Sequence, residues 1–234
     1  MRLGVIGDGK MGRAVAALAA ERGHEVVAVL GESENEGGAA VLAGQLRNAE
    51  VAVEFTEPRA AVANALACLS VGLPVVIGTT GWHDRLPEVR VALERADGAL
   101  LYAPNFSAGV VLFTELVARA GRLFAAAQSF DAHLTETHHT AKKDAPSGTA
   151  LALANAFAAG SGRAPAITSI RTGHVPGTHE LILDGPFEQV RLTHTARDRR
   201  VFADGALQAA EWLRGRRGMF TMRDVLGLGE EREA

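Results

Sequence analysis

Short apolar runs alternate with alanine-rich stretches of helical periodicity along the first part of the chain. Strands are predicted at residues 3–6, 25–30, 51–55, 74–77 and 99–102, and helices at residues 10–22, 58–71 and 83–96. Strands and helices that alternate in this way are typical of strand-helix units around a parallel sheet. The pattern therefore predicts an α/β, doubly wound domain of the Rossmann-like type.

The pattern changes after Asn105. Residues 109–124 form a long apolar segment that predicts a helix, and polar and apolar residues then alternate over residues 130–138. Further alternating runs, separated by Gly and Pro, predict an antiparallel or mixed sheet. These runs cover residues 167–172, 179–184 and 189–195. Residues 203–213 have a helical pattern, and we expect this last helix to pack back onto the first domain.

This organisation predicts two domains. Residues 1–104 are expected to form the dinucleotide-binding domain, with residues 203–234 packed against it. Residues 105–202 are expected to form an α+β domain with a mixed sheet, for substrate binding and oligomerisation. The polar stretch 32–38 is predicted to be a mobile loop, and the charged tail after Gly229 is predicted to fray.

Net charge, apolar run length and cysteine content limit the classes of partner and the environment expected for the protein. The 234 residues carry a formal net charge of −3, so neither nucleic acid nor an anionic membrane is indicated as a partner. No apolar run approaches membrane-spanning length, and the first strand begins almost at Met1, which predicts a cytoplasmic protein. The single cysteine, Cys68, falls at an apolar position of a predicted helix, so we expect a buried, unreactive thiol.

A glycine motif directly follows the first predicted strand and opens the first predicted helix. It consists of Gly7, Asp8, Gly9, Lys10, Met11 and Gly12. In this context Gly7 permits a tight turn, Gly9 lets the backbone approach a pyrophosphate, and Gly12 allows close packing of helix on strand. The helix N-terminus adds amides and positive potential. We therefore predict that this motif and Arg13 bind NADH or NADPH, and a merely structural glycine turn is the weaker alternative.

The sequence leaves the choice between NADH and NADPH open. Glu32 lies about 20 residues after Gly12, where an acidic residue binds the ribose hydroxyls of NAD. A solvated loop carboxylate is an equal alternative for Glu32, because it begins a polar stretch. Lys10 and Arg13, in the first turns of the helix, could instead meet the 2′-phosphate of NADP.

Two later turns also follow predicted strands. Because the carboxyl ends of parallel strands lie on the ligand side of the sheet, we expect both turns to contact the nicotinamide half of the cofactor. The residues concerned are Gly78, Thr79 and Thr80 in the first turn and Ala103, Pro104, Asn105 and Phe106 in the second.

Residues 136–149 hold the densest chemistry in the chain. His138 and Lys142 can each move a proton, and His139 can add positive charge. Residues 146–149 predict the start of a helix whose free amides favour an anion. We therefore predict a reaction centre for a small acidic molecule. An ordinary set of polar residues at a strand end is the weaker alternative, because proton carriers and a helix start occur together.

Two further interpretations concern the same run. Adjacent side chains of an extended segment point to opposite faces, so we expect Lys143 to face solvent and Lys142 to face the site. His133, Glu136 and His138 match no zinc-ligand spacing, so no metal is predicted.

Together these segments resemble the dihydrodipicolinate reductase family over nearly the whole chain. The deciding signature is the run His-His-x-x-Lys-x-Asp-Ala-Pro-Ser-Gly-Thr from His138 to Thr149. The resemblance implies reduction of 4-hydroxy-tetrahydrodipicolinate, a cyclic imine dicarboxylate, to tetrahydrodipicolinate by NAD(P)H in diaminopimelate and lysine biosynthesis. It implies that His138 is the acid/base group and Lys142 the proton donor, and that His139, Gly148 and Thr149 bind a substrate carboxylate. It also implies a homotetramer assembled through the sheets of the second domain.

The chemistry of this reaction agrees with the residues present. Hydride addition to a conjugated C=C–C=N unit leaves an electron-rich nitrogen, so a cation or proton donor such as Lys142 lowers the barrier. One departure is Gly31, which stands where the family often has an acidic residue. The alternatives are another two-domain NAD(P)-dependent dehydrogenase and a non-catalytic dinucleotide sensor. The sensor hypothesis leaves the cluster around His138 and Lys142 unexplained.

Overall fold

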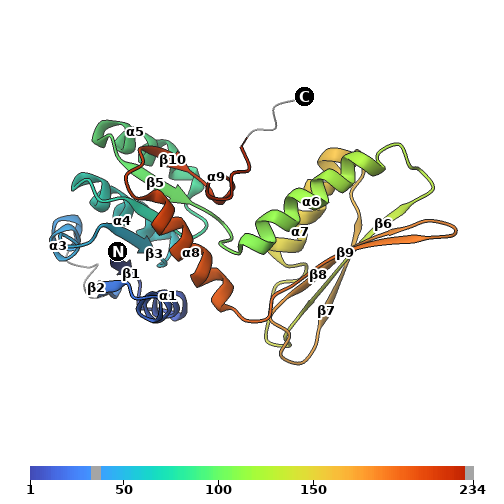
Figure 1. Cartoon of the computed structure of the whole chain (residues 1–234), viewed down its shortest axis with the longest axis horizontal. Coiled ribbons are helices and arrows are strands. Elements are labelled where there is room, and N and C mark those ends of the chain that lie inside the picture. Colours follow the sequence, from blue (N-terminus) through green and yellow to red (C-terminus); the bar gives the residue numbers. More distant parts are fainter. Residues whose placement is uncertain (33–37, 230–234) are drawn as a thin grey trace. The chain divides into compact units, whose positions relative to one another are not determined.

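The computed structural model describes residues 1–32 and 38–229, in two compact units (Figure 1). The first unit comprises Met1–Ala108 together with the chain from Arg200 onward, and the second comprises Gly109–Arg199. Residues 33–37 of the predicted mobile loop, and the predicted frayed tail after Gly229, lie outside the described residues. Among the described residues, no helix combines the length and the apolar character that crossing a membrane requires.

A parallel sheet forms the centre of the first unit, with strand order β10-β5-β4-β3-β1-β2. Its strands are β1 (Arg2–Ile6), β2 (Glu25–Leu30), β3 (Val51–Glu54), β4 (Val75–Ile77), β5 (Ala99–Tyr102) and β10 (Gly218–Phe220). Strands β3 and β4 are buried along their whole length, because helices cover both faces of the sheet. The predicted parallel α/β sheet is therefore confirmed. Strand β10 was not predicted, because it has only three residues.

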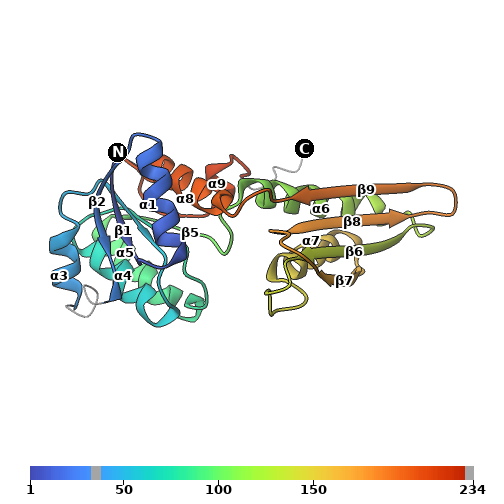
Figure 2. The same cartoon turned by 90° about the horizontal axis from the view of Figure 1, so that it is seen from below.

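Helices cover this sheet on both sides (Figures 1 and 2). Helices α1 (Lys10–Glu21) and α8 (Arg200–Leu213) pack against each other on one face. The other face is covered by α3 (Gly38–Gln45), α4 (Pro58–Ser70) and α5 (Leu86–Ala96), with the short helix η1 (His83–Arg85) beside α5. The short helix α9 (Met222–Val225) contacts α8 and the edge strand β10. Cys68 of α4 is buried as predicted, and burial, with the nearby charge of Glu54, raises the pKa of its thiol to about 12.

The second unit is a mixed sheet covered by helices on one face, as Figure 1 shows. The strand order is β7-β6-β8-β9, where β6 (Asp131–His138) pairs parallel with β7 (Ala166–Arg171). The pairs with β8 (Thr178–Asp184) and β9 (Gln189–Thr195) are antiparallel, so the predicted mixed sheet is confirmed. Helices α6 (Ala108–Phe124) and α7 (Gly148–Ser161) contribute to one core with β6 and β8, which includes Val117, Leu134, Phe157 and Leu181.

Candidate active site

The register of the second sheet collects polar side chains on its helix-covered face. Every second residue of β6 points to that face, so Glu136 and His138 continue the row begun by the core residue Leu134. Glu136 pairs with His179 of β8, and His138 pairs with Arg171 of β7. Side chains from three strands therefore meet where the apolar core ends.

The start of α7 lies against this polar cluster. Ser147 is the N-cap of the helix, and its Oγ accepts a hydrogen bond from the Ala150 amide at 3.1 Å. The Ser147 amide donates to Oε1 of Glu136 at 3.3 Å, and its hydroxyl lies 3.2 Å from Nε2 of His179. Gly148 is exposed, and the space that a Cβ would occupy there is open. The sheet thus fixes a helix N-terminus that is suited to an anion.

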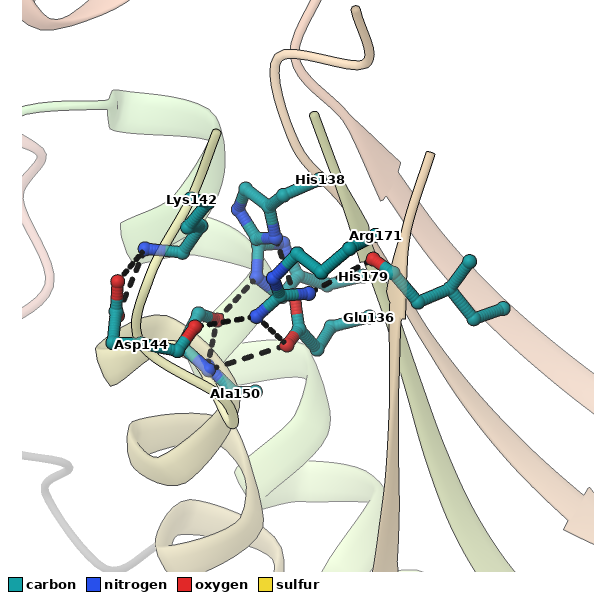
Figure 3. A network of polar contacts seen from close by, with 9 residues as sticks. Glu136, His138, Lys142, Asp144, Ala150, Arg171 and His179 are labelled. Atoms are coloured by element: carbon teal, nitrogen blue, oxygen red, sulfur yellow. Dashed lines mark hydrogen bonds and ion pairs between the residues drawn. The ribbon is translucent and has the colours of Figure 1, made fainter. Parts of the chain in front are cut away.

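Glu136 is the centre of the network shown in Figure 3. Its side chain is fully buried; Oε2 accepts a short hydrogen bond from Nδ1 of His138, and Oε1 accepts one from Arg171 at 2.7 Å. Burial raises the pKa of Glu136, but hydrogen bonds from Arg171, Ser169 and His138 outweigh this effect and lower it to about 2. Glu136 is therefore a carboxylate at any working pH.

Both buried histidines of the network are neutral near pH 7. Burial lowers the pKa of His138, and the positive charges of Lys142 and Arg171 act in the same direction, against the opposing effect of Glu136. Burial also lowers the pKa of His179 to about 4, with the neighbouring His138 contributing. A neutral His138 can accept a proton, which is the state that an acid/base group needs before it takes part in a proton relay.

Lys142 lies at the exposed edge of the same network (Figure 3). Its Nζ is 2.7 and 2.8 Å from the two carboxylate oxygens of Asp144, and this ion pair lowers the pKa of Asp144. Arg171 donates to the backbone carbonyl of Asp144 at 2.5 Å, so contacts run without a break from His138 through Glu136 to Lys142. Lys143 is exposed, as predicted.

Glu136, His138 and His179 form a group whose ligand atoms lie within 4.8 Å of one another, close enough to hold a metal ion. This group differs from the set considered from the sequence, which contained His133, Glu136 and His138. Alternation along β6 points His133 to the face opposite Glu136 and His138, so these three residues cannot share a metal ion. The guanidinium of Arg171 already forms an ion pair with the carboxylate of Glu136, and its positive charge would repel a metal ion bound there. We therefore interpret the group as a hydrogen-bonded network.

The glycine motif of the first unit has the geometry of a pyrophosphate turn. A Cβ on Gly12 would lie 1.7 Å from the carbonyl oxygen of Gly7, and one on Gly7, where φ is +105°, would lie 2.0 Å from that of Phe55. Gly9 caps α1 without a side-chain hydrogen bond, and the space above its Cα is open. The open space at Gly9 therefore leaves room for a dinucleotide phosphate at the N-terminus of α1.

The motif lies at the switch point of the sheet, between β1 and β3. From β1 the sheet continues to β2 on one side and to β3, β4 and β5 on the other.

Glu54, a fully buried acid at the end of β3, was not among the predicted site residues. Its Oε1 accepts hydrogen bonds from the Thr56 amide at 3.1 Å and from Asn64 at 3.4 Å, and also from the Thr56 hydroxyl. Its Oε2 has no partner among the described residues. The sequence signal that could have revealed this buried acid is a single acidic residue inside the otherwise apolar run 51–55.

The predicted cofactor turns differ in which side chains they expose. The Thr79 side chain is buried and accepts a hydrogen bond from the Thr56 amide at 2.7 Å, whereas Thr80 is exposed. Phe106 is buried and packs edge-to-face on Phe55, with ring centroids 5.8 Å apart. A contact from Thr79 or Phe106 to a cofactor would therefore come from the backbone, and the roles of all these residues stay predictions.

The remaining predicted cofactor residues lie on the surface around these turns. Asp8, Lys10, Arg13, Glu32 and Pro104 are exposed, and Glu32 lies 3.3 Å from Arg59 of α4. Asn105 is half-buried, and its Oδ1 accepts a hydrogen bond from the Ser107 amide at 2.9 Å. His139, a predicted substrate residue, is half-buried, and its amide donates to the carbonyl oxygen of Val175 at 2.8 Å.

Glu54→Gln should change how stability depends on pH. Burial raises the pKa of Glu54 above its ordinary value of 4.5, although hydrogen bonds from Thr56, Thr79 and Asn64 oppose this. The folded state therefore retains a proton that the unfolded state has lost, so wild-type stability falls as pH rises from about 4.5 through the folded pKa. The melting temperature of the variant minus that of wild type should rise over this window and then level off.

Tryptophan fluorescence measures this transition in the first unit, because Trp82 and Trp212 both belong to it. A difference in melting temperature that stays constant between about pH 4.5 and about pH 8 would contradict a raised pKa at Glu54.

A glycine turn at the switch point of a parallel sheet, in one chain with a buried network of a carboxylate and neutral histidines, places this protein among the nicotinamide-dinucleotide-dependent oxidoreductases. Comparison with known families narrows the class. Residues 1–106 match the family described as dihydrodipicolinate reductase, N-terminus, and residues 109–226 match dihydrodipicolinate reductase, C-terminus. The chain belongs to the dihydrodipicolinate reductase family, which confirms the resemblance found in the sequence. The cofactor of this family is NADH or NADPH.

Individual relatives agree with this assignment. A 4-hydroxy-tetrahydrodipicolinate reductase from Christiangramia forsetii is 34% identical over 97% of this chain and 98% of the relative. The enzyme of that name from Xanthomonas campestris is 40% identical over 94% of each chain. Among solved structures, a dipicolinate-bound dihydrodipicolinate reductase from Paenisporosarcina has a TM-score of 0.82 at 21% identity, covering 96% of this chain and 98% of that one. This structural likeness confirms the predicted fold class.

Proposed function

We propose that this protein catalyses the NAD(P)H-dependent reduction of 4-hydroxy-tetrahydrodipicolinate to tetrahydrodipicolinate, a step of diaminopimelate and lysine biosynthesis. The observation that supports this most strongly is the convergence of Lys142 and the Glu136–His138 pair beside the N-terminus of α7. Relatives that match nearly the whole chain bear the name of this reductase.

The start of α7 is the proposed carboxylate site. Gly148 and Thr149 provide the first amides of a 14-residue helix, whose N-terminal end favours negative charge. His139 directly follows β6, and its imidazole is proposed as a further hydrogen-bond donor to the substrate carboxylate. The exposed carboxylate of Asp144 already pairs with Lys142, which demonstrates that this cation accepts a carboxylate partner.

The chain's own groups supply the proton chemistry. Loss of the 4-hydroxyl group as water gives the conjugated imine, and the bound dinucleotide would supply the hydride that reduces it. Lys142, released from Asp144 when the substrate carboxylates bind, would donate a proton to the substrate nitrogen or polarise it. His138 would exchange protons with the bound substrate in the same relay, since it is neutral. The contacts from His138 through Glu136, Arg171 and Asp144 to Lys142 hold the two groups in place and carry no proton, because Arg171 does not deprotonate. Hydride and proton are both needed for one reduction.

Cofactor choice, assembly and location stay predictions. Glu32 favours the ribose hydroxyls of NADH, whereas Lys10 and Arg13 favour the 2′-phosphate of NADPH. We also propose a homotetramer joined through the face of the second-unit sheet that α6 and α7 do not cover, where Ile170 is exposed. A cytoplasmic location agrees with the biosynthetic reaction.

A coupled assay tests the proposed function, because the substrate is unstable and must be made in place. Purified protein is mixed with pyruvate, aspartate semialdehyde and a dihydrodipicolinate synthase, and the loss of NADH or NADPH absorbance is followed in parallel. We expect oxidation that depends on the synthase, and the ratio of the two rates gives the cofactor preference. Nucleotide binding without oxidation would indicate a sensor, and oxidation without the synthase would indicate another dehydrogenase.

A further inference from the structure

Glu136 donates no proton and binds no substrate in the proposed chemistry. It is fully buried where the apolar core that contains Leu134 and Leu181 ends. A buried carboxylate is costly unless it is paired and hydrogen-bonded. Its two oxygens are divided between two tasks: Oε2 accepts from His138, and Oε1 accepts from Arg171 and from the Ser147 amide.

The pairing with a carboxylate decides where neutral His138 carries its proton. An ionised carboxylate only accepts hydrogen bonds, so Nδ1 of His138 must be the protonated nitrogen and Nε2 must hold the free lone pair. Gly177 lies on that side of the ring, where a Cβ would be 3.0 Å from Nε2. Because Gly177 has no side chain, this residue does not crowd Nε2. The nitrogen left for proton exchange is therefore Nε2.

Arg171 connects Glu136 to the turn that carries Lys142, the second predicted proton carrier. Its guanidinium bonds to Oε1 of Glu136 at 2.7 Å and to the carbonyl oxygen of Asp144 at 2.5 Å. Asp144 in turn holds Nζ of Lys142. Removing the negative charge of Glu136 would leave Arg171 without its buried partner and would disturb the turn that carries Lys142.

We propose that Glu136 is a positioning residue that fixes His138 as the Nδ1-protonated tautomer, with Nε2 as the proton-exchanging atom, and that it orients the Lys142 turn through Arg171. This inference rests on the proposed function, because its kinetic consequence requires turnover. The tautomer itself can be measured without turnover.

Glu136→Gln gives the kinetic test. The amide group can bond to Arg171 through its oxygen and donate to Nδ1 of His138 through its nitrogen, which enforces the opposite tautomer. We expect kcat to fall by at least about 10²-fold, compared with the roughly 10⁴-fold loss when the analogous Asp is changed to Asn in a Ser-His-Asp triad. The Kd for NADH, measured by its fluorescence, should not change.

Glu88→Gln is the matched control. Glu88 also pairs with an arginine, Arg85 at 2.8 Å, but it is an exposed residue of α5 in the first unit and belongs neither to the predicted cofactor residues nor to the proposed interface. This variant should keep the wild-type kcat. If Glu136→Gln also keeps it, the proposal is wrong.

A double-mutant cycle separates positioning from a general structural effect. Because Glu136 is proposed to act largely through His138, the double variant Glu136→Gln/His138→Ala should be nearly as active as His138→Ala alone. If the two losses instead multiply fully, Glu136 does not act through His138 and the proposal fails.

A spectroscopic measurement on the wild-type protein keeps the inference testable even if Glu136→Gln does not fold. Long-range ¹H–¹⁵N spectra of histidine side chains, assigned with His138→Ala, distinguish the two neutral tautomers. They are recorded above the lowered pKa of His138, whose charged and titratable neighbours are Glu136, Lys142, Arg171 and His179. A proton on Nδ1 supports the proposal and a proton on Nε2 overturns it. A wild-type protein with this tautomer but no reductase activity would contradict only the proposed function.

Discussion

Lys142→Ala should lower kcat by about 10²- to 10⁴-fold, the range associated with the loss of a positioned proton donor. Lys142 provides the ammonium group at the edge of the network in Figure 3, 2.7 Å from Asp144, and no other lysine of the described residues pairs with that carboxylate. The variant should fold, because the side chain of Asp144 that loses its partner is 59% exposed and can be solvated. Affinity for NADH should not change, since the glycine motif belongs to the other unit.

Lys143→Ala is the control that separates this role from a general loss of positive charge. Lys143 is the adjacent residue and is exposed, so its removal changes the net charge by the same amount. The coupled assay should give near wild-type kcat for Lys143→Ala. If Lys142→Ala turned over as fast as Lys143→Ala, the proposed proton donor would have to be abandoned.

Gly12→Ala should weaken NADH binding by about 10- to 100-fold, equivalent to about 1–3 kcal/mol of strain from overpacking. The added Cβ would lie 1.7 Å from the carbonyl oxygen of Gly7, and both groups are held by backbone, so neither can move away without distorting the turn. The turn that would cradle the pyrophosphate therefore shifts. Fluorescence titration with NADH measures the change in Kd.

Gly44→Ala is the matched control for this substitution. Gly44 lies in α3 of the same unit, and a Cβ there meets nothing within 4 Å. The Kd for NADH should equal that of wild type, and the melting temperature should not fall. Wild-type NADH affinity in Gly12→Ala would show that the motif is a structural turn and not the nucleotide site.

Much of the architecture followed from local patterns. The strands of the first sheet were predictable because each is a short apolar run bounded by turn residues, as in residues 51–54 and 75–77. Strand β10 was missed because Gly218–Phe220 is short and only half-buried, so it has little periodicity to detect. The N-terminus of α7 was predictable because Ser147 followed by Gly148 is a strong local capping signal.

The site could be predicted only in part. His138 and Lys142 were found because they lie within a few residues of each other in a distinctive run. The hydrogen-bonded network around them was not predicted, because Arg171 and His179 are 35 and 43 residues beyond Glu136 in the chain (171 − 136 and 179 − 136). Glu54 was missed for the related reason that a lone acid in an apolar run shows neither its burial nor its partners.

The sequence by itself determined the parallel first sheet, the glycine turn, the helix start at Ser147 and the presence of two proton carriers beside it. These properties depend on residue type and short-range spacing, which local physics constrains strongly. Only the tertiary structure decided that Glu136 pairs with His138 and Arg171. That outcome depends on the register of β6 against β7 and β8, and a shift of one residue would move these side chains to opposite faces. Register is set by contacts between distant segments, which no local pattern contains.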